Sequence, residues 1–293
     1  MVLSKNAHKD TSKNTNFCKI IIGKLNDIRY IPHNKIGDSV CGQPILAFFV
    51  GNRKARNKIL VTGGMHAREW VTALVVAELA KKYYKMYQKN KFDAEIIFIP
   101  LTNPDGVRLA IDGLTPFFAK QKKFLLSVNS GDTDFSQWKA NANAVDINVN
   151  FDANWGGGVQ NVFSPAPANY VGKYPESEPE TQSLVNIVNR LHPSSSIAFH
   201  TKGDIIYYGF DQLPEWQIER DKIIADDISA QTGYPPVQSV GSAGGLNDWI
   251  ALTTTAPAFT VEVGSDTLPH PIGEDQLPAI MNRVNNLLDI FLQ

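Results

Sequence analysis

The 293-residue sequence has few cysteines, no long apolar run and no excess of charge of either sign. Its two cysteines, Cys18 and Cys41, could pair, but a single pair in a chain of this length more often consists of two reduced thiols. A run of about 18 apolar residues, as a membrane-spanning helix needs, is absent. A net charge of −1 gives no electrostatic reason to expect a nucleic acid or a membrane surface as partner.

The first residues lack the apolar centre of a secretory signal, so we expect a cytoplasmic protein. Residues 1–16 are polar and rich in lysine, which predicts a flexible tail. The remainder, residues 17–293, shows no internal repeat and no linker that would separate domains. With 43% hydrophobic residues in the chain, these positions can bury one large core, so we expect a single domain.

Strand-like and helix-like stretches alternate along this domain. Short apolar stretches ended by glycine or a turn predict buried strands at 45–51, 58–64, 94–101, 195–203 and 256–264. Helical spacing of apolar residues predicts helices at 68–89, 177–191 and 273–292, the last with a late start at Pro278. Ser177 and Glu180 have the spacing of a capping box, whereas residues 112–175 look irregular. This alternation predicts a three-layer α/β/α sandwich with a mixed, largely parallel central sheet.

His66 and Glu69 follow a predicted strand that ends in two glycines. Residues three apart share a face once the chain turns helical, so this imidazole and carboxylate can meet one metal ion. A catalytic zinc often takes two histidines and one glutamate, and His200, at the end of another predicted strand, is the best third ligand. The alternative is a surface pair of polar residues. The other histidines lie in the tail or beside loop prolines, namely His8, His33, His192 and His270.

The stretch "HAREW", together with His200, resembles the zinc carboxypeptidase family of metallopeptidases. The family's further motifs occur in the expected order over roughly residues 35 to 290, as "IGDSVCGQPI", "NPDG", "VDIN-N", "SEPET", "GGLNDW" and "FTVEVG". This resemblance implies that residues 17–293 form one metallopeptidase catalytic domain. It also implies one zinc ion per chain, with His66, Glu69 and His200 as its ligands.

The resemblance assigns catalytic roles to two further carboxylates. Glu262 matches the glutamate that takes a proton from the zinc-bound water and delivers it to the leaving amine. The strand pattern is compatible with this role, because Ala258, Thr260 and Glu262 share one strand face. Asp146 matches the aspartate that orients a ligand histidine through its other ring nitrogen.

Several positions depart from the family's carboxypeptidases, which hold the terminal carboxylate of the substrate with an asparagine–arginine pair. Asn148 is kept, but Val149 stands where the arginine belongs, and valine cannot form a bidentate clamp. Lys139 matches the arginine that stabilises the oxyanion. Val240 stands in place of the substrate-capping tyrosine. Asn247 occupies the position that sets side-chain preference.

One bacterial branch of the family, the γ-D-glutamyl–diamino acid peptidases, is similar over "WKANANAVDINVNFDANWG" and "HTKGDIIYY". These enzymes hydrolyse the amide between the γ-carboxyl of D-glutamate and meso-diaminopimelate or lysine. The resemblance implies a cell-wall stem peptide as substrate, in muropeptide recycling or in wall remodelling during sporulation. Substrate contacts are then expected from Asn148, Arg68, Asn247 and Lys202.

Three hypotheses follow for the function. The favoured one is a zinc peptidase that cleaves the γ-D-glutamyl–diamino acid bond of muropeptides. The second is a true carboxypeptidase in which Lys139 or Lys202 supplies the missing cation. The third is an inactive zinc-binding or peptide-binding module, against which the complete set of ligands and general base argues.

Overall fold

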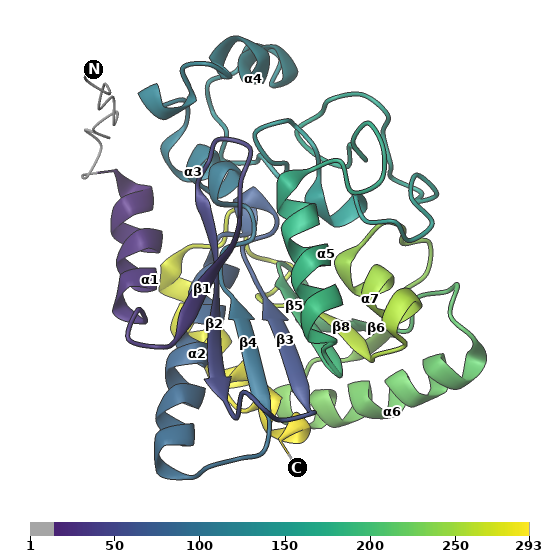
Figure 1. Cartoon of the computed structure of the whole chain (residues 1–293). Coiled ribbons are helices and arrows are strands. Elements are labelled where there is room, and N and C mark those ends of the chain that lie inside the picture. Colours follow the sequence, from purple (N-terminus) through teal and green to yellow (C-terminus); the bar gives the residue numbers. More distant parts are fainter. Residues whose placement is uncertain (1–14, 293) are drawn as a thin grey trace, which may run out of the picture.

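One eight-stranded sheet organises the chain in the structure, a computed structural model that describes residues 15–292 (Figure 1). The strand order is β1-β2-β4-β3-β5-β8-β6-β7. The strands are β1 (His33–Asp38), β2 (Pro44–Gly51), β3 (Lys58–Thr62), β4 (Glu95–Ile99), β5 (Ser195–His200), β6 (Ile205–Tyr208), β7 (Pro236–Gln238) and β8 (Ala258–Glu262). The four central strands are parallel, whereas β2 is antiparallel to β4 and β6 to β8. The predicted mixed sheet with a parallel centre is confirmed.

Helices cover both faces of this sheet. One face carries α1 (Gly23–Asp27), α2 (Val71–Lys89), α6 (Glu215–Thr232) and α8 (Leu277–Val284). The other carries α5 (Pro179–Leu191) and α7 (Leu246–Thr254). Two shorter helices, α3 (Pro104–Asp112) and α4 (Lys122–Val128), lie beyond the upper end of the sheet in Figure 1. The three-layer α/β/α sandwich is therefore confirmed.

The central strands are apolar on both faces because both faces are covered. In β3 the side chains alternate, so Ile59 and Val61 join the core under α2, whereas Leu60 joins the core under α5 and α7. All five residues of β4 are buried. A continuous apolar run is the sequence pattern that such two-sided burial requires.

Two predicted helices differ from the structure in their ends. The helix expected at 68–89 begins at Val71, after a 3₁₀ turn over Ala67–Glu69. The helix expected at 273–292 is divided into a 3₁₀ turn, α8 and a second 3₁₀ turn, and Pro278 lies in the first turn of α8 as predicted. The region 112–175 is mostly irregular but contains α4 and two 3₁₀ turns, at Pro116–Phe118 and at Ile147–Val149.

The capping box predicted from Ser177 and Glu180 is wrong. α5 begins at Pro179, and no side chain caps its N-terminus. The Glu180 carboxylate is instead buried and accepts hydrogen bonds from the backbone N–H of Val40 (3.1 Å) and from Asn141 Nδ2 (3.0 Å). Donors from a neighbouring loop and from a distant side chain have replaced the local partner, which no spacing rule can anticipate.

Burial raises the pKa of Glu180 to about 8, so the stability of the fold should depend on pH. The folded state binds a proton between about pH 4.5 and pH 8, where the unfolded state has lost it. The free energy of unfolding should therefore fall as pH rises through this window, by up to about 1.4 kcal/mol per pH unit. Glu180→Gln should flatten this slope in urea denaturation at pH 5–8.

The exposed Glu219→Gln is the matched control and should keep the wild-type slope. A Glu180→Gln protein whose slope equals that of the wild type would contradict the assignment of the slope to this carboxylate.

Three remaining expectations concern the chain as a whole. Cys18 and Cys41 are free thiols. Most of the predicted tail, residues 1–14, lies outside the described residues. In the part that the structure describes, no helix is both long and apolar enough to cross a bilayer.

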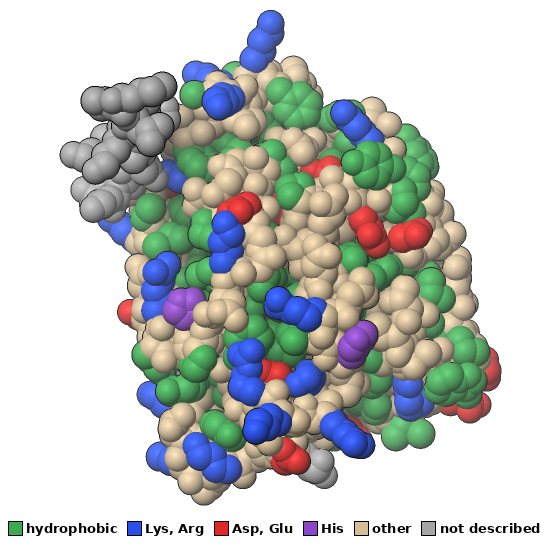
Figure 2. Space-filling view, in the orientation of Figure 1, with side chains coloured by type: hydrophobic (Ala, Val, Ile, Leu, Met, Phe, Trp, Pro, Cys, Tyr) green, Lys and Arg blue, Asp and Glu red, His purple; other side chains and the backbone are tan. Residues whose placement is uncertain are grey.

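On the face drawn in Figure 2, Lys and Arg side chains gather over the lower ends of β2, β3 and β4, where the buried Glu95 pairs with Arg53 and Lys58.

Candidate active site

The carboxyl ends of three parallel strands bring the predicted site together. His200 is the last residue of β5, and Glu262, the last residue of β8, is its register partner. His66 and Glu69 follow β3, the other neighbour of β5. From β3 the chain crosses to β4 on one side and later returns to β5 on the other. This is a topological switch point, where open α/β sheets commonly bind ligands.

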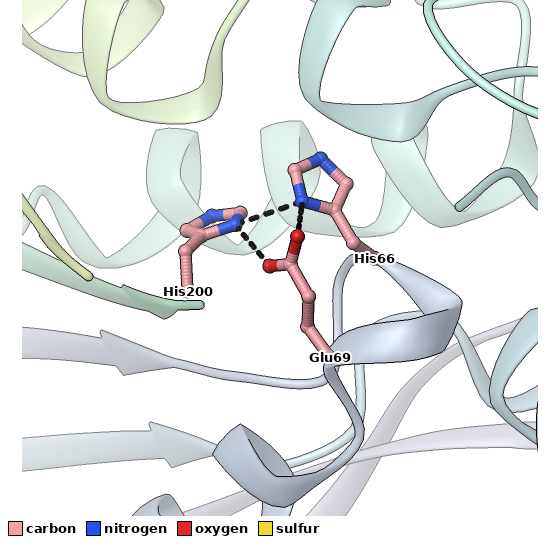
Figure 3. A group of neighbouring side chains, drawn as sticks. All are labelled: His66, Glu69 and His200. Atoms are coloured by element: carbon pink, nitrogen blue, oxygen red, sulfur yellow. Dashed lines mark hydrogen bonds and ion pairs between the residues drawn. The ribbon is translucent and has the colours of Figure 1, made fainter. Parts of the chain in front are cut away.

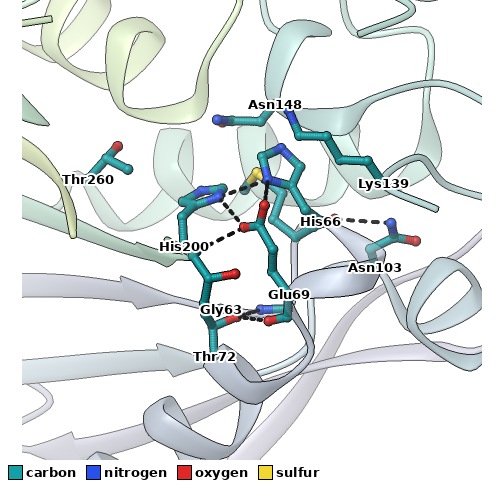
Figure 4. Close-up of polar contacts among 12 residues, drawn as sticks. Gly63, His66, Glu69, Thr72, Asn103, Lys139, Asn148, His200 and Thr260 are labelled. Atoms are coloured by element: carbon teal, nitrogen blue, oxygen red, sulfur yellow. Dashed lines mark hydrogen bonds and ion pairs between the residues drawn. The ribbon is translucent and has the colours of Figure 1, made fainter. Parts of the chain in front are cut away.

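Two glycines turn the chain from β3 towards the site. A Cβ atom on Gly63 would lie 2.6 Å from the carbonyl oxygen of Thr72, and Gly64 has a φ of +59°. The Gly64 N–H donates to Thr72 Oγ1 (2.8 Å), which donates to the carbonyl of Glu69 (2.7 Å). Figure 4 shows this link between the turn and the first residues of α2. The close packing fixes the position of Glu69.

His66, Glu69 and His200 turn their polar atoms towards one point (Figure 3). His66 Nδ1 lies 3.0 Å from Glu69 Oε1 and 3.0 Å from His200 Nδ1. His200 Nδ1 lies 3.1 Å from Glu69 Oε2. All three residues are buried, with exposed fractions of 5% or less. The predicted ligand set is therefore brought together, and every member reaches one candidate metal site.

This geometry fits zinc. Ligand atoms about 2.1 Å from a tetrahedral ion lie about 3.4 Å from one another, close to the separations seen here. Two imidazoles and one carboxylate are also the ligands of many catalytic zinc sites, which keep a fourth position open. Two buried histidine nitrogens that face each other beside a carboxylate do not stabilise an apolar core, so the arrangement indicates a metal site.

The charges in the site are strongly coupled. Burial opposes ionisation of Glu69, but the two histidines outweigh it and hold the pKa of Glu69 well below its usual value. Burial also lowers the pKa of His66, yet the Glu69 and Asp146 carboxylates give a net upward shift in that pKa. The carboxylate of Glu69 is thus kept ionised, as a metal ligand must be.

Asp146 lies on the other side of His66 and is fully buried. Its Oδ1 is 3.2 Å from His66 Nε2, and its Oδ2 is 3.0 Å from Lys139 Nζ. The backbone N–H groups of Asn148 and Asn169 also donate to it, each at 3.1 Å. Burial opposes the charge, but Lys139 and His66 lower the pKa of Asp146 far below its usual value. Because the Asp146 carboxylate lies beside Nε2, that ring nitrogen carries the proton. The lone pair of the other ring nitrogen, His66 Nδ1, then faces the metal site.

Asn103 is a positioning residue that the sequence analysis did not identify. Its Nδ2 donates to the carbonyls of Met65 (3.0 Å) and Ala140 (3.1 Å), which joins the segment before His66 to the segment after Lys139. Its Oδ1 accepts from the backbone N–H of Gly106 and caps α3. The sequence "NPDG" was interpreted as a turn and as a motif of the family, although asparagine before proline is also a helix N-cap signal.

A cavity of about 400 Å³ opens beside the metal site. Its wall includes Lys139, Asn148 and Glu262 from the predicted site. Sequence analysis assigned no role to the other polar residues of this wall, which are Gln160, Asn161, Asn169, Tyr207, Ser239, Ser242, Asp248 and Thr260. They come from loops, strands and helix α7, far apart in the sequence, so no local motif marks them.

The substrate-contact residues predicted from the resemblance lie in different surroundings. Asn148 lines the cavity, and its Oδ1 accepts from the backbone N–H of Leu246 (3.1 Å). Asn247 also lines it, but its amide is engaged with β5 and β8. The Lys202 ammonium donates to two backbone carbonyls, those of residues 266 and 268. Arg68 is partly buried, and neither it nor Lys202 is part of the cavity wall.

Val149 and Val240, two of the positions that depart from the carboxypeptidase pattern, both line the cavity. Val149 follows Asn148 in the 3₁₀ turn, and Val240 is 76% exposed at the mouth. Among the described residues of this wall, Lys139 is the only lysine or arginine. Its ammonium is already held by Asp146 and by Asn169 Oδ1 (3.5 Å). The cavity therefore offers no cation that is free to clamp a carboxylate.

The two histidines and one glutamate of the ligand set lie beside a cavity that is also lined by the carboxylate of Glu262. This arrangement is typical of the site of a zinc hydrolase. A family model described as zinc carboxypeptidase matches residues 31–282. The chain belongs to this family and is by family a zinc metallopeptidase. The resemblance stated from the motifs is confirmed.

Individual relatives agree with this assignment. The chain is 33% identical over 271 residues to γ-D-glutamyl-L-diamino acid endopeptidase 1 of Lysinibacillus sphaericus; the match covers 85% of this chain and 66%, just under two thirds, of that protein. Bovine thrombin-activatable fibrinolysis inhibitor is similar in structure, with a TM-score of 0.70, 20% identity and 92% of each chain covered. Murein-tripeptide amidase MpaA from Escherichia coli O157 has a TM-score of 0.57 at 23% identity, with 90% of this chain and 93% of that chain covered.

Removing the charge of Asp146 should weaken zinc binding. In Asp146→Asn, His66 Nε2 loses its carboxylate partner and Lys139 loses its counter-ion, so we expect about 10- to 100-fold weaker zinc affinity. Competition with a chromophoric chelator measures this affinity. The exposed Asp152→Asn, in the same segment, is the control and should bind zinc as the wild type does. A folded Asp146→Asn protein with unchanged zinc affinity would contradict the role given to Asp146.

Proposed function

We propose that the chain hydrolyses the amide bond between the γ-carboxyl of D-glutamate and the amine of a diamino acid in cell-wall stem peptides. The diamino acid is meso-diaminopimelate or lysine. The observation that carries this proposal is the cavity beside the metal site, in which Val149 replaces a clamping arginine and Lys139 is already paired.

A carboxypeptidase has to hold a terminal carboxylate in its cavity. A carboxylate that moves from water into a partly buried site loses solvation free energy, and without a cation in the site no interaction compensates for this loss. The side chain of Val149 has no donor, and Lys139, the one lysine or arginine of the described wall, is held in place beside the metal site by Asp146. This wall therefore suits a substrate whose chain continues, or whose charge lies elsewhere, better than one that ends in a carboxylate.

Two relatives support the same substrate class. The Lysinibacillus protein is named as an endopeptidase for γ-D-glutamyl-L-diamino acid bonds, and the E. coli structure is named as a murein-tripeptide amidase. In such substrates the bond that breaks is formed by a side-chain carboxyl of glutamate. The α-carboxylate of that glutamate remains free on the other side of the bond, away from the amine that leaves.

The chemistry needs an electrophilic centre and a group that moves a proton. When held by His66, Glu69 and His200, zinc supplies Lewis-acid chemistry and lowers the pKa of water to about 7. Glu262 takes a proton from the attacking water and delivers it to the leaving amine. Its Oε2 is buried without a hydrogen-bond partner among the described residues. Burial, and then the nearby charge of Glu69, raise the pKa of Glu262 to about 8, a value near the working pH that suits a group which both takes up and gives back a proton.

Other side chains bind and orient the substrate. Lys139, which lines the cavity and is held there by Asp146, would stabilise the negative charge that develops on the carbonyl oxygen. Asn148 uses its Oδ1 for the backbone of α7, which leaves its amide N–H groups for the substrate. Because Lys202 already donates to two carbonyls, Arg68 is the better partner for the free α-carboxylate of D-glutamate. Arg68 Nε has no partner among the described residues.

A paired digest with zinc-loaded protein, followed by mass spectrometry, tests the proposal. L-Ala-γ-D-Glu-meso-diaminopimelyl-D-Ala, in which the chain continues beyond the diamino acid, should release L-Ala-D-Glu, whereas a plain peptide should keep its C-terminal residue. Glu262→Gln should lower the first rate about 10²- to 10⁴-fold, because a general base is lost. The exposed Glu215→Gln is the control and should keep the wild-type rate. Trimming of the plain peptide alone would overturn the proposal in favour of a carboxypeptidase.

A further inference from the structure

Besides the catalytic Glu262, the cavity wall holds one carboxylate, that of Asp248, with no cation among the described residues to balance it. Asp248 lies in the first turn of α7, is 8% exposed and lines the cavity. Its Oδ2 accepts from Ser242 Oγ (2.6 Å) and from the backbone N–H of Gly245 (3.3 Å). Both donors are neutral, and both bonds are made by the same oxygen atom. Burial raises the pKa of the Asp248 carboxyl, which Asp211 raises further.

The surrounding wall cannot supply a counter-ion. Lys139 is the only lysine or arginine among the described lining residues, and it is bound to Asp146 at 3.0 Å. Asp211, whose Oδ2 accepts from the Gly241 N–H (3.0 Å), adds negative charge at this end of the cavity. Asp248 is the N3 residue of the capping box of α7, so the helix N-terminus stabilises its carboxylate in part. No full positive charge of the described wall faces it, however, and a cationic group of a ligand would stabilise it further.

The neighbouring Asn247 is not available for this task. Its Nδ2 donates to the carbonyl of Phe259 (2.7 Å) and to Thr260 Oγ1 (3.1 Å). Its Oδ1 accepts from Ser196 Oγ (2.9 Å). These three bonds tie α7 to β8 and β5, so a substrate group that bound the Asn247 amide would first have to break them. Asp248 Oδ1, by contrast, takes part in none of the bonds just described.

We infer that Asp248 receives the distal ammonium group of the diamino acid and sets the preference for a cationic side chain on the amine side of the cleaved bond. This inference rests on the proposed function, which places a diamino acid in the cavity. Meso-diaminopimelate and lysine both carry a distal ammonium group. The same carboxylate therefore explains how either residue is preferred over an apolar one of equal length.

Three substrates that differ only in the residue after γ-D-glutamate test this inference on the wild-type protein. They carry lysine, norleucine or Nε-acetyl-lysine, so chain length is kept while the charge is removed. A charge-assisted hydrogen bond should make kcat/KM for lysine about 10- to 100-fold higher than for the two neutral residues. Salt should reduce this ratio only weakly, because the carboxylate is buried.

Variants then assign the preference to one residue. Asp248→Asn keeps an acceptor for the Gly245 N–H but removes the charge, and should bring the lysine and norleucine rates together. Ser242→Ala removes a hydrogen bond from the same oxygen but keeps the charge, so the lysine preference should remain. If Asp248→Asn fails to fold, the comparison of the three substrates on the wild-type protein still decides.

The outcomes separate the inference from the proposed function. Equal rates for lysine and norleucine in the wild type overturn the inference and leave the γ-glutamyl specificity intact. A lysine preference that survives in a folded Asp248→Asn protein also overturns it. Hydrolysis of none of the γ-linked substrates overturns the proposed function, and the inference falls with it.

Discussion

The fully buried carboxylate of Asp146 is the interaction on which the rest of the site depends. Four groups lie against it: a ring nitrogen of His66 and the Lys139 ammonium in ion-pair contact, and the backbone N–H groups of Asn148 and Asn169 as hydrogen-bond donors. These groups come from the loop after β3 and from the long irregular region before α5. Without this buried negative charge, no carboxylate would fix the orientation of the ligand His66 or of Lys139 in the cavity wall.

This single charge has a different role beside each of its two side-chain neighbours, His66 and Lys139. Beside His66 it orients a metal ligand and strengthens the ring nitrogen that faces the site. Beside Lys139 it holds the one cation of the described cavity wall, which then serves the reacting carbonyl rather than a distant carboxylate. Together with Val149, it leaves a cavity wall in which Asp248, like the catalytic Glu262, lacks a counter-ion among the described residues. The electrostatics thus favour a positive side chain over a negative chain end.

Much of the fold could be predicted from the sequence because its signals are local. Continuous apolar runs such as 94–101 indicated strands covered on both faces, and the structure has β4 there with five buried residues. The metal ligands could be predicted for the same reason, since His66, Glu69 and His200 each follow or end a strand of the parallel centre. Parallel strands bring their carboxyl ends to one edge, so strand order and ligand position are not independent.

The features that escaped prediction are those set by distant partners. Glu180 has capping-box spacing, but Val40 and Asn141 engage its carboxylate from other parts of the chain. The wall of the cavity combines loops whose proximity only the fold creates, so the sequence pointed to Asn247 and passed over Asp248. The Asn247 amide is engaged in hydrogen bonds with β5 and β8, which cannot be predicted from the sequence because the partners are distant along the chain.

The most direct test of a cavity without a free cation is to change the end of the substrate. Two γ-D-glutamyl-lysine peptides, one ending in a free carboxylate and one in a neutral amide, would be compared by their kcat/KM. We expect the amide to be cleaved at least as fast as the acid, and Val149→Arg to shift the preference towards the acid. A wild-type protein that cleaves the acid about 10²-fold faster or more would possess a carboxylate clamp, and the central claim would be wrong.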